Sequence, residues 1–200
     1  QAAGWAESTR LTGDMRVRIP EEGAHHILTD ANSAAADFRP SLRCRFIKAP
    51  QRAIGDSRSE WELLTDALGK DTLATLPTLA SLNDIGDAYA LLYGSELLQL
   101  TKTQPTYHMA AYDIGTTSIV CYLLDGKSGQ ELAVSSMLNP QAAFGADVIS
   151  RARYALEHGG NSLQHAVIEA MNRLLMEACE RAGVLPDTVY LIAAAGNTCM

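Results

Sequence analysis

The sequence predicts an α/β fold built in two successive parts, residues 41–105 and 106–200. Two observations support this class. Short apolar or alternating runs bounded by glycine, proline and asparagine predict strands in both parts. Stretches with apolar residues three and four positions apart predict helices that pack on those strands. Residues 1–40 contain one expected strand, Met15–Ile19, and we interpret the remainder as a linker region.

Composition limits the classes of function. The chain has 200 residues, of which 47% are hydrophobic and 20% charged, enough for one or two globular domains. Its net charge of −7 argues against a nucleic-acid-binding surface. No run approaches the roughly 18 apolar residues of a membrane span, and no signal-peptide pattern is present. We therefore expect a cytoplasmic protein, and the ends at Gln1 and Met200 indicate an excerpt of a longer one.

Cysteine and histidine form no recognisable ligand set. The cysteines are far apart and lack Cys-x-x-Cys spacing, so we interpret them as free thiols rather than a disulfide or iron–sulfur framework. They are Cys44, Cys121, Cys179 and Cys199. Adjacent side chains of the His25-His26 pair diverge and no third ligand is near, so we interpret the pair as solvated linker residues.

The first structured part begins with a strand and a helix. Residues 42–47 alternate like a half-exposed strand that ends near Pro50. Ser59 and Glu62 form a capping-box signature, which predicts the start of a helix, and Gly69 predicts its end.

A second helix and a hairpin are expected next. The pattern predicts a short helix over residues 72–82. Residues 88–93 and 96–100 are strand-like and are separated by the dipeptide Gly94-Ser95, which is typical of a tight β-hairpin.

The second part opens with three strands linked by hairpins. Apolar residues before Tyr112 and from Ile119 to Leu124 flank a tight turn. A polar turn, Asp125–Gly129, then leads into a third strand over residues 131–137.

The first of these turns has the chemistry of a phosphate-binding loop. Gly115 allows close approach of the backbone to a ligand, while Thr116, Thr117 and Ser118 offer hydroxyl and N–H donors to phosphate oxygens. Asp113 would hold hydrated Mg²⁺ or orient a water. The alternative is an ordinary hairpin in which Asp and Gly only make the turn.

Two helices are expected after the third strand. The first opens at Gly145-Ala146-Asp147, where Asp147 suits the positive helix end, and runs to about His158. The second is capped by Asn161 or Ser162 and ends at Gly183. Its apolar stripe comprises Leu163, Val167, Ala170, Leu174 and Ala178.

The last apolar run predicts a strand at the centre of a sheet. Residues 189–195 are almost uninterruptedly apolar, a pattern typical of a strand covered on both faces. Gly196-Asn197-Thr198 follows its carboxyl end, where ligands bind in open α/β sheets. We expect this polar turn to lie close to the first.

Five motifs between residues 107 and 200 resemble, as a set, one protein family. They are Ala111 to Val120, Leu123-Leu124-Asp125, Leu138-Asn139-Pro140-Gln141, Gly145 to Arg151, and Gly196-Asn197-Thr198-x-Met200. The family is that of the reductive activators of corrinoid proteins, a branch of the ASKHA superfamily of actin, Hsp70 and sugar kinases. The resemblance implies an actin/Hsp70/sugar-kinase-like (ribonuclease H-like) half-domain at 106–200, preceded by a small α/β middle domain at 41–105.

The resemblance also implies roles for individual residues. Asp113 would be catalytic and would position Mg²⁺ through water, while Gly115 to Ser118 would cradle the β- and γ-phosphates of ATP. Gly196 and Asn197 would stand near the phosphate, with Asn197 as a neutral polar orienter.

The implied function is ATP-dependent reduction of a Co(II) corrinoid to Co(I) on a methyltransferase corrinoid protein. Electrons would arrive through a [2Fe-2S] ferredoxin-like domain that is absent from this chain, as is the adenosine-binding half. We therefore expect the fragment alone to be inactive. Its expected partner is the corrinoid protein, and a second copy of the chain is a further candidate.

Two other functions stay open from the sequence. One is a small-molecule kinase of the ASKHA superfamily, although no clear base for a substrate hydroxyl is present. The other is a non-catalytic docking module, whose partner binding would be unaffected by Asp113→Ala.

Overall fold

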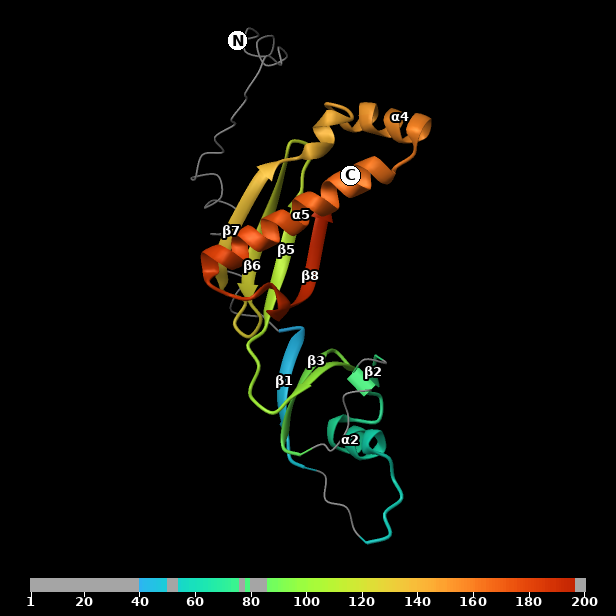
Figure 1. The fold of residues 1–200 in the computed structure, drawn as a ribbon, viewed down its shortest axis with the longest axis vertical. Coiled ribbons are helices and arrows are strands. Elements are labelled where there is room, and N and C mark those ends of the chain that lie inside the picture. Colours follow the sequence, from blue (N-terminus) through green and yellow to red (C-terminus); the bar gives the residue numbers. More distant parts are fainter. Residues whose placement is uncertain (1–39, 50–53, 76–77, 80–85, 197–200) are drawn as a thin grey trace. The chain divides into compact units, whose positions relative to one another are not determined.

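The computed structural model describes residues 40–49, 54–75, 78–79 and 86–196. They form two four-stranded sheets with helices (Figure 1). The α/β class is confirmed. The expected strand Met15–Ile19, the His25-His26 pair and Asn197 lie outside the described residues.

The first sheet has the strand order β1-β3-β4-β2. Its strands are β1 (Leu42–Ile47), β2 (Leu73–Ala74), β3 (Ala88–Tyr93) and β4 (Glu96–Thr101). The predicted hairpin across Gly94-Ser95 is confirmed, and Gly94 has a φ of 58°, a left-handed conformation that glycine adopts at little cost. β1 pairs antiparallel with β3 at the edge of the sheet.

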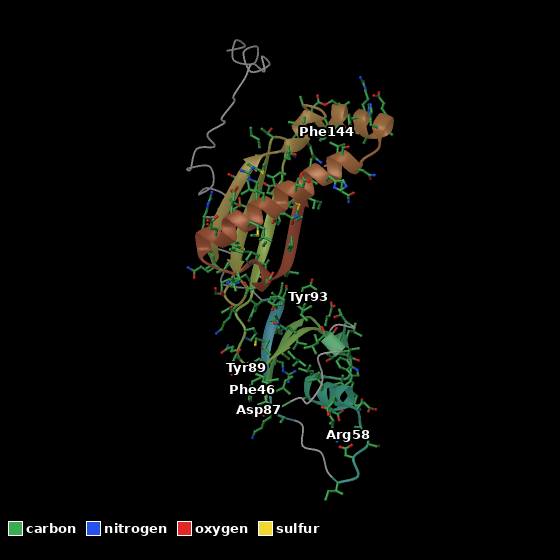
Figure 2. The ribbon with its side chains drawn as sticks, in the orientation of Figure 1. Phe46, Arg58, Asp87, Tyr89, Tyr93 and Phe144 are labelled. Carbon is green, nitrogen blue, oxygen red and sulfur yellow. The ribbon has the colours of Figure 1, made fainter. Side chains whose placement is uncertain are left out.

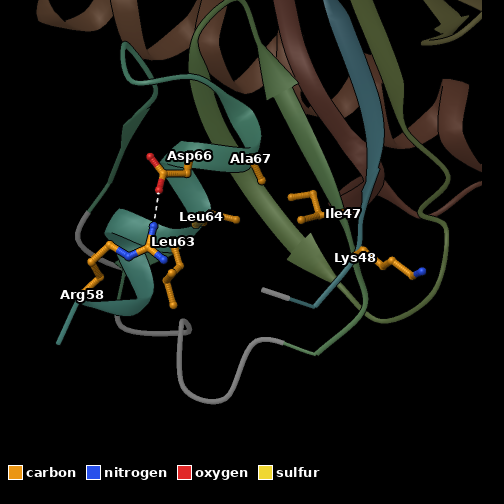
Figure 3. A pocket seen from close by; sticks show the side chains of 7 residues that line it. All are labelled: Ile47, Lys48, Arg58, Leu63, Leu64, Asp66 and Ala67. Carbon is orange, nitrogen blue, oxygen red and sulfur yellow. Dashed lines mark hydrogen bonds and ion pairs between the residues drawn. The ribbon is translucent and has the colours of Figure 1, made fainter. Parts of the chain in front are cut away.

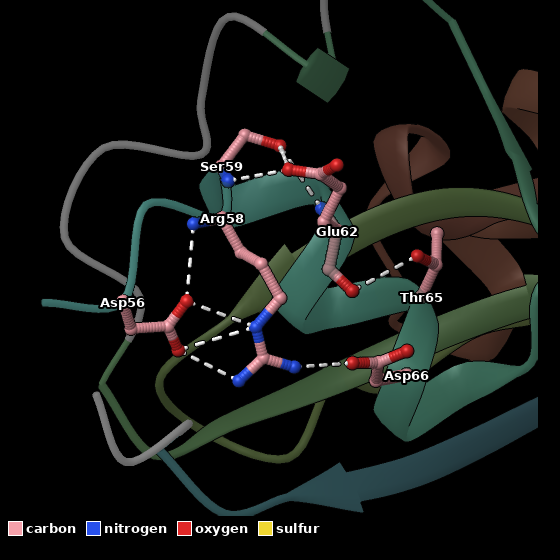
Figure 4. A network of polar contacts seen from close by, with 6 residues as sticks. All are labelled: Asp56, Arg58, Ser59, Glu62, Thr65 and Asp66. Carbon is pink, nitrogen blue, oxygen red and sulfur yellow. Dashed lines mark hydrogen bonds and ion pairs between the residues drawn. The ribbon is translucent and has the colours of Figure 1, made fainter. Parts of the chain in front are cut away.

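Helix α2 (Glu60–Leu68) has the predicted capping box. The Glu62 N–H donates to Ser59 Oγ (3.2 Å), and the Ser59 N–H donates to a Glu62 carboxylate oxygen (2.6 Å) (Figure 4). The Arg45 guanidinium donates to the carbonyl oxygens of Ala67 and Leu68, both at 3.1 Å, and so ties the last turn of α2 to β1.

The predicted helix over residues 72–82 is wrong at its start. Leu73 and Ala74 form β2, which pairs parallel with Glu96 and Leu97 of β4. Thr78 and Leu79 are helical, and residues 76–77 and 80–82 lie outside the described residues. The Leu73 N–H donates to the carbonyl of Ser95 (2.9 Å). A long-range ladder bond thus takes up a donor that a helix would have used locally.

The second sheet has the order β7-β6-β5-β8. It comprises β5 (His108–Ile114), β6 (Ser118–Asp125), β7 (Glu131–Leu138) and β8 (Val189–Gly196). The first three strands are consecutive and antiparallel, as predicted, whereas β8 pairs parallel with β5. Consequently β5 and β8 have their carboxyl ends at the same edge of the sheet.

Helical segments connect β7 to β8. They are the 3₁₀ helix η2 (Pro140–Ala143), α4 (Val148–His158), α5 (Asn161–Ala182) and the 3₁₀ helix η3 (Pro186–Thr188). Figure 1 shows α5 lying across the sheet. Among the described helices, even the 22-residue α5 lacks the apolar length that a membrane span requires.

The core between α5 and the second sheet follows the predicted stripe. Ala170, Leu174 and Ala178 of α5 are at most 3% exposed and pack against Ile119 and Leu123 of β6. The predicted end at Gly183 is confirmed by its φ of 67°. The predicted side-chain cap is wrong, because α5 begins at Asn161 and its N-cap, Gly160, has no side chain.

The prediction that residues 189–195 form a strand is confirmed, but the prediction that both of its faces are covered is wrong for the described residues. β8 is an edge strand, and its residues from Ile192 to Gly196 are exposed. The apolar composition therefore reflects a surface that no described residue covers.

Candidate functional site

The turn between β5 and β6 lies at the sheet edge where β5 and β8 both end. Ile114 pairs with Ile119 across the hairpin and with Gly196 on β8. The approach at Gly196 is close, since a Cβ there would lie 3.1 Å from the Ile114 carbonyl oxygen. The structure thus brings Gly196 next to the end of β5, while it does not describe Asn197.

Asp113 stands on the face of the sheet opposite α5. Its neighbour Tyr112 faces α5 and donates from its hydroxyl to the carbonyl of Met171 (2.8 Å), and successive side chains of a strand point to opposite faces. The Asp113 side chain is exposed. Burial raises the pKa of Tyr122 on β6, and the negative charge of Asp113 adds to that rise.

The three carbonyl groups of the turn are all bound by protein donors. Asn139 Nδ2 donates to the Gly115 oxygen (2.8 Å), and the Asn139 backbone N–H donates to the Thr117 oxygen (2.8 Å). Between them, Arg151 Nη2 donates to the Thr116 oxygen (2.7 Å). Two side chains from the segment after β7, those of Asn139 and Arg151, therefore hold the turn on the side to which its carbonyl groups point.

Unlike the carbonyl groups, most N–H groups of the turn have no hydrogen-bond partner among the described residues. Gly115 N–H donates to the Ser118 oxygen (2.9 Å), which closes the hairpin. The N–H groups of Thr116 and Thr117 donate to no acceptor among the described residues. This arrangement fits a phosphate group with bound Mg²⁺. Two adjacent N–H groups have no described acceptor, the three carbonyl oxygens already accept hydrogen bonds, and the Asp113 carboxylate is exposed.

The side chains that brace the turn are themselves buried and linked. Asn139, Gln141 and Arg151 are 1%, 2% and 1% exposed. Gln141 N–H donates to Asn139 Oδ1 (2.9 Å), and Gln141 Nε2 donates to the Leu163 carbonyl on α5 (3.1 Å). Arg151 Nε donates to the Gly145 oxygen (2.9 Å). The network joins the turn to η2, α4 and α5.

Sequence reasoning assigned no site role to Asn139, Gln141 or Arg151, although all three lie within the motifs that carried the resemblance. A signal for Arg151 was its place in the first turn of α4, where the helix dipole disfavours a cation unless tertiary acceptors hold it. Burial lowers the pKa of Arg151 and the Asp147 carboxylate opposes that shift.

Asp147 has the structural role that the sequence predicts. It is the N-cap of α4, where Ser150 N–H donates to its Oδ1 (2.7 Å) and its own N–H donates to Ser150 Oγ (3.1 Å). The hydrogen bond from the Ser150 backbone N–H is the main cause that holds the pKa of Asp147 below its usual value.

The described cysteines do not fit an iron–sulfur cluster, which requires four ligands. Cys44, Cys121 and Cys179 are free thiols, as predicted. Cys121 on β6 and Cys179 on α5 lie in the core between α5 and the second sheet, where burial raises their pKa values. Within the described residues, no group of three or more His, Cys, Asp or Glu side chains is placed to hold a metal ion.

Two hollows lie away from this turn. One, of about 300 Å³, is lined by Ile47, Leu64 and Arg58 (Figure 3). The Arg58 guanidinium forms ion pairs with Asp56 and Asp66 (Figure 4). The other, of about 450 Å³, lies on α4 beside the Phe144–Tyr154 pair, whose ring centroids are 5.0 Å apart. Neither contains a residue that the sequence predicts to bind nucleotide.

Exposed aromatic side chains also occur on the first sheet. Phe46 and Tyr89 are opposite each other on β1 and β3, with ring centroids 5.1 Å apart, and Phe46 is 55% exposed (Figure 2). This pair forms an apolar surface feature without catalytic groups.

Comparison with known proteins gives consistent matches. Residues 108–200 match the family model described as the RACo middle region. The chain is 30% identical over 196 residues to the corrinoid activation enzyme RamQ of Eubacterium limosum. The alignment covers 90% of this chain and 32% of RamQ. The solved structure of a reductive activator for corrinoid, iron-sulfur protein is similar with a TM-score of 0.74 and 28% identity, over 82% of this chain and 29% of that one. The chain thus spans less than two thirds of either relative.

Proposed function

Because the chain belongs to the family of reductive activators of corrinoid proteins, we propose that it is the nucleotide-phosphate-binding portion of an ATP-dependent activator. The parent protein would return the Co(II) corrinoid of a methyltransferase corrinoid protein to Co(I). Residues 1–40 would be linker, residues 41–105 a small α/β middle domain, and residues 106–200 the first half of an ASKHA-type ATPase domain.

The observation that carries the proposal is the polarity of the turn after β5. Its carbonyl oxygens accept hydrogen bonds from Asn139 and Arg151, while the N–H groups of Thr116 and Thr117 are free among the described residues. Such a turn presents positive dipole ends at the carboxyl edge of a sheet, where ligands of α/β proteins bind.

Each residue of the site would have a distinct task. The N–H groups of Thr116 and Thr117 and the hydroxyl of Ser118 would donate to the β- and γ-phosphate oxygens. Asp113 would hold Mg²⁺ through a bound water and would orient that water. A carboxylate in direct contact with phosphate would be repelled by it. Bound Mg²⁺ would neutralise charge that develops on the phosphates. Gly196 would leave room for Asn197 to approach the same phosphates.

ATP would act as a switch between domain arrangements. A nucleotide that binds one arrangement more tightly than another shifts the equilibrium by that difference in affinity. Closure on the corrinoid protein would follow from ATP binding, and electrons would enter through a [2Fe-2S] domain elsewhere in the parent. We place the parent in the cytoplasm.

The test uses the full-length protein with a Co(II) corrinoid protein, a reductant and Mg-ATP. The cobalt absorption spectrum and phosphate release are followed together. We expect Co(I) only with ATP, and Asp113→Ala should lower both rates at least about 100-fold, as for loss of a preorganised electrostatic group. The control is Asp187→Ala, which changes an exposed aspartate on η3, before the start of β8.

Other outcomes would favour the other functions. Equal rates in wild type and Asp113→Ala would contradict the ATPase role. Phosphate release that depends on a small hydroxyl compound, without any cobalt change, would indicate a kinase. Partner binding that ignores both ATP and Asp113→Ala would indicate a docking module.

A further inference from the structure

The buried guanidinium of Arg151 makes contacts that helix packing alone does not require. It is 1% exposed, yet it donates to two main-chain oxygens outside its own helix, those of Thr116 and Gly145. Burying a charge is unfavourable unless hydrogen bonds compensate, and these two carbonyls contribute to that compensation only while they keep their present direction. Arg151 Nη1 also donates to Gln141 Oε1 at 3.5 Å. Thr116 is 35 positions away in the sequence, so the contact is tertiary.

Peptide geometry converts these contacts into an orientation of donors. The described part of the chain contains no cis peptide bond, and in a trans peptide the C=O and the following N–H point in opposite directions. A Thr116 oxygen directed at Arg151 therefore turns the Thr117 N–H away from Arg151. In the same way, a Gly115 oxygen directed at Asn139 turns the Thr116 N–H outward.

The orientation matters because the turn could adopt the opposite polarity. Rotation of either peptide would direct a carbonyl oxygen outward, where its partial negative charge would repel phosphate. Arg151 disfavours an outward carbonyl at Thr116 for two reasons. Its guanidinium would lose the Thr116 oxygen as an acceptor, and its positive charge attracts that oxygen toward the interior side of the turn. Arg151 itself is too buried to touch a ligand.

We propose that Arg151 and Asn139 are positioning residues for nucleotide phosphate, which fix the two peptides between residues 115 and 117 with the N–H groups of Thr116 and Thr117 directed outward. This inference depends on the proposed function and adds residues that do not contact the ligand. It predicts that nucleotide affinity depends on the guanidinium geometry and not only on a positive charge at position 151.

The experiment compares Mg-ATP affinity in full-length variants by calorimetry, with urea unfolding of each variant. Arg151→Lys keeps the charge but loses the planar set of donors that reaches both carbonyls. Asn139→Asp keeps the oxygen that accepts from Gln141 N–H but replaces the donor to Gly115 with a second acceptor. We expect either variant to weaken Mg-ATP binding about 10- to 100-fold, as for loss of a charged hydrogen bond.

The control variant is Ser135→Ala. Ser135 is 1% exposed and donates to the Leu174 carbonyl (2.7 Å), so its loss should lower the urea midpoint without changing Mg-ATP affinity. The backbone amide chemical shifts of Thr116 and Thr117 should change in Arg151→Lys and stay unchanged in Ser135→Ala.

The outcomes separate this inference from the proposed function. Wild-type affinity in Arg151→Lys and Asn139→Asp would overturn the inference and leave the ATP site intact. Failure of the unmodified full-length protein to bind Mg-ATP would overturn the proposed function, and the inference with it. Weakened binding in both variants, with normal binding in Ser135→Ala, would support both.

Discussion

Gly145 lies in the loop before α4, in close contact with the backbone of Ser150 and Arg151. A Cβ at this position would lie 2.5 Å from Ser150 Oγ and 2.7 Å from the backbone nitrogen of Arg151. No side chain tolerates such distances unless the neighbouring atoms move. The Gly145 carbonyl also accepts from Arg151 Nε. The absence of a side chain here thus lets α4 bring its arginine to the turn.

We expect Gly145→Ala to lower the free energy of unfolding by about 1–3 kcal/mol, the range for overpacking a closely packed site. The matched control is Gly160→Ala, because Gly160 has a φ of −84° and no atom within 4 Å of an added Cβ. It should change stability by no more than about 0.5 kcal/mol. Urea unfolding measures both, and equal stability of the two variants would contradict the packing argument.

The hairpin between β6 and β7 shows how one carboxylate organises an element. Asp125 Oδ1 accepts from Ser128 Oγ (2.7 Å), Ser128 N–H (2.7 Å) and Lys127 N–H (3.1 Å). The hydrogen bond from the Ser128 side chain is the main cause that lowers the pKa of Asp125, and both backbone N–H groups add to it. The ionised form of Asp125 is therefore favoured in the folded state.

This pKa shift predicts a pH dependence. Because the native pKa of Asp125 is lower than its unfolded value of about 3.9, its contribution is complete well above pH 4 and is lost as pH falls through the native pKa. Asp125→Asn should be less stable than wild type at neutral pH, and the difference should shrink below about pH 4. Urea midpoints measured from neutral to acid pH check this.

Ser128→Ala provides the companion variant for this hairpin. It removes the main donor to Asp125 and should reduce the same pH-dependent difference. A stability difference between wild type and Asp125→Asn that stays constant across the acid range would contradict the assignment of the shift to these hydrogen bonds.

At the scale of the whole molecule, β8 gives the described chain an uncovered apolar edge. It pairs only with β5 among the described strands, and Ile192 is 51% exposed. Sheet edges with exposed apolar residues associate readily with other chains, and natural proteins protect them with charges or with covering elements.

We expect the 200-residue chain to self-associate with rising concentration, and Ile192→Lys to reduce that association, because a charge on an edge strand opposes pairing. The control is Ile168→Lys on α5, where the isoleucine is 47% exposed but not on a sheet edge. Sedimentation velocity over a concentration series measures the effect. Association that Ile192→Lys leaves unchanged would show that another surface is responsible.

The elements of the fold could be predicted largely from the sequence because their signals are local. The apolar spacing of α5, the capping box of α2 and the turn dipeptide Gly94-Ser95 each act over a few residues. The α/β class and the three hairpin-linked strands followed from them. The candidate turn was found in the same way, since Asp113 and Gly115 to Ser118 are contiguous.

Long-range contacts decided the rest. Leu73 and Ala74 became a strand because β4 offers a ladder, and β8 became an exposed edge because no described strand pairs beyond it. The polarity of the turn depends on Arg151 and Asn139, which lie 35 and 24 residues from their acceptors, and no local pattern records such a pairing. The sequence therefore determined the elements and the turn, whereas only the tertiary structure decided which way its donors point, because hydrogen bonds between distant residues hold the peptide planes.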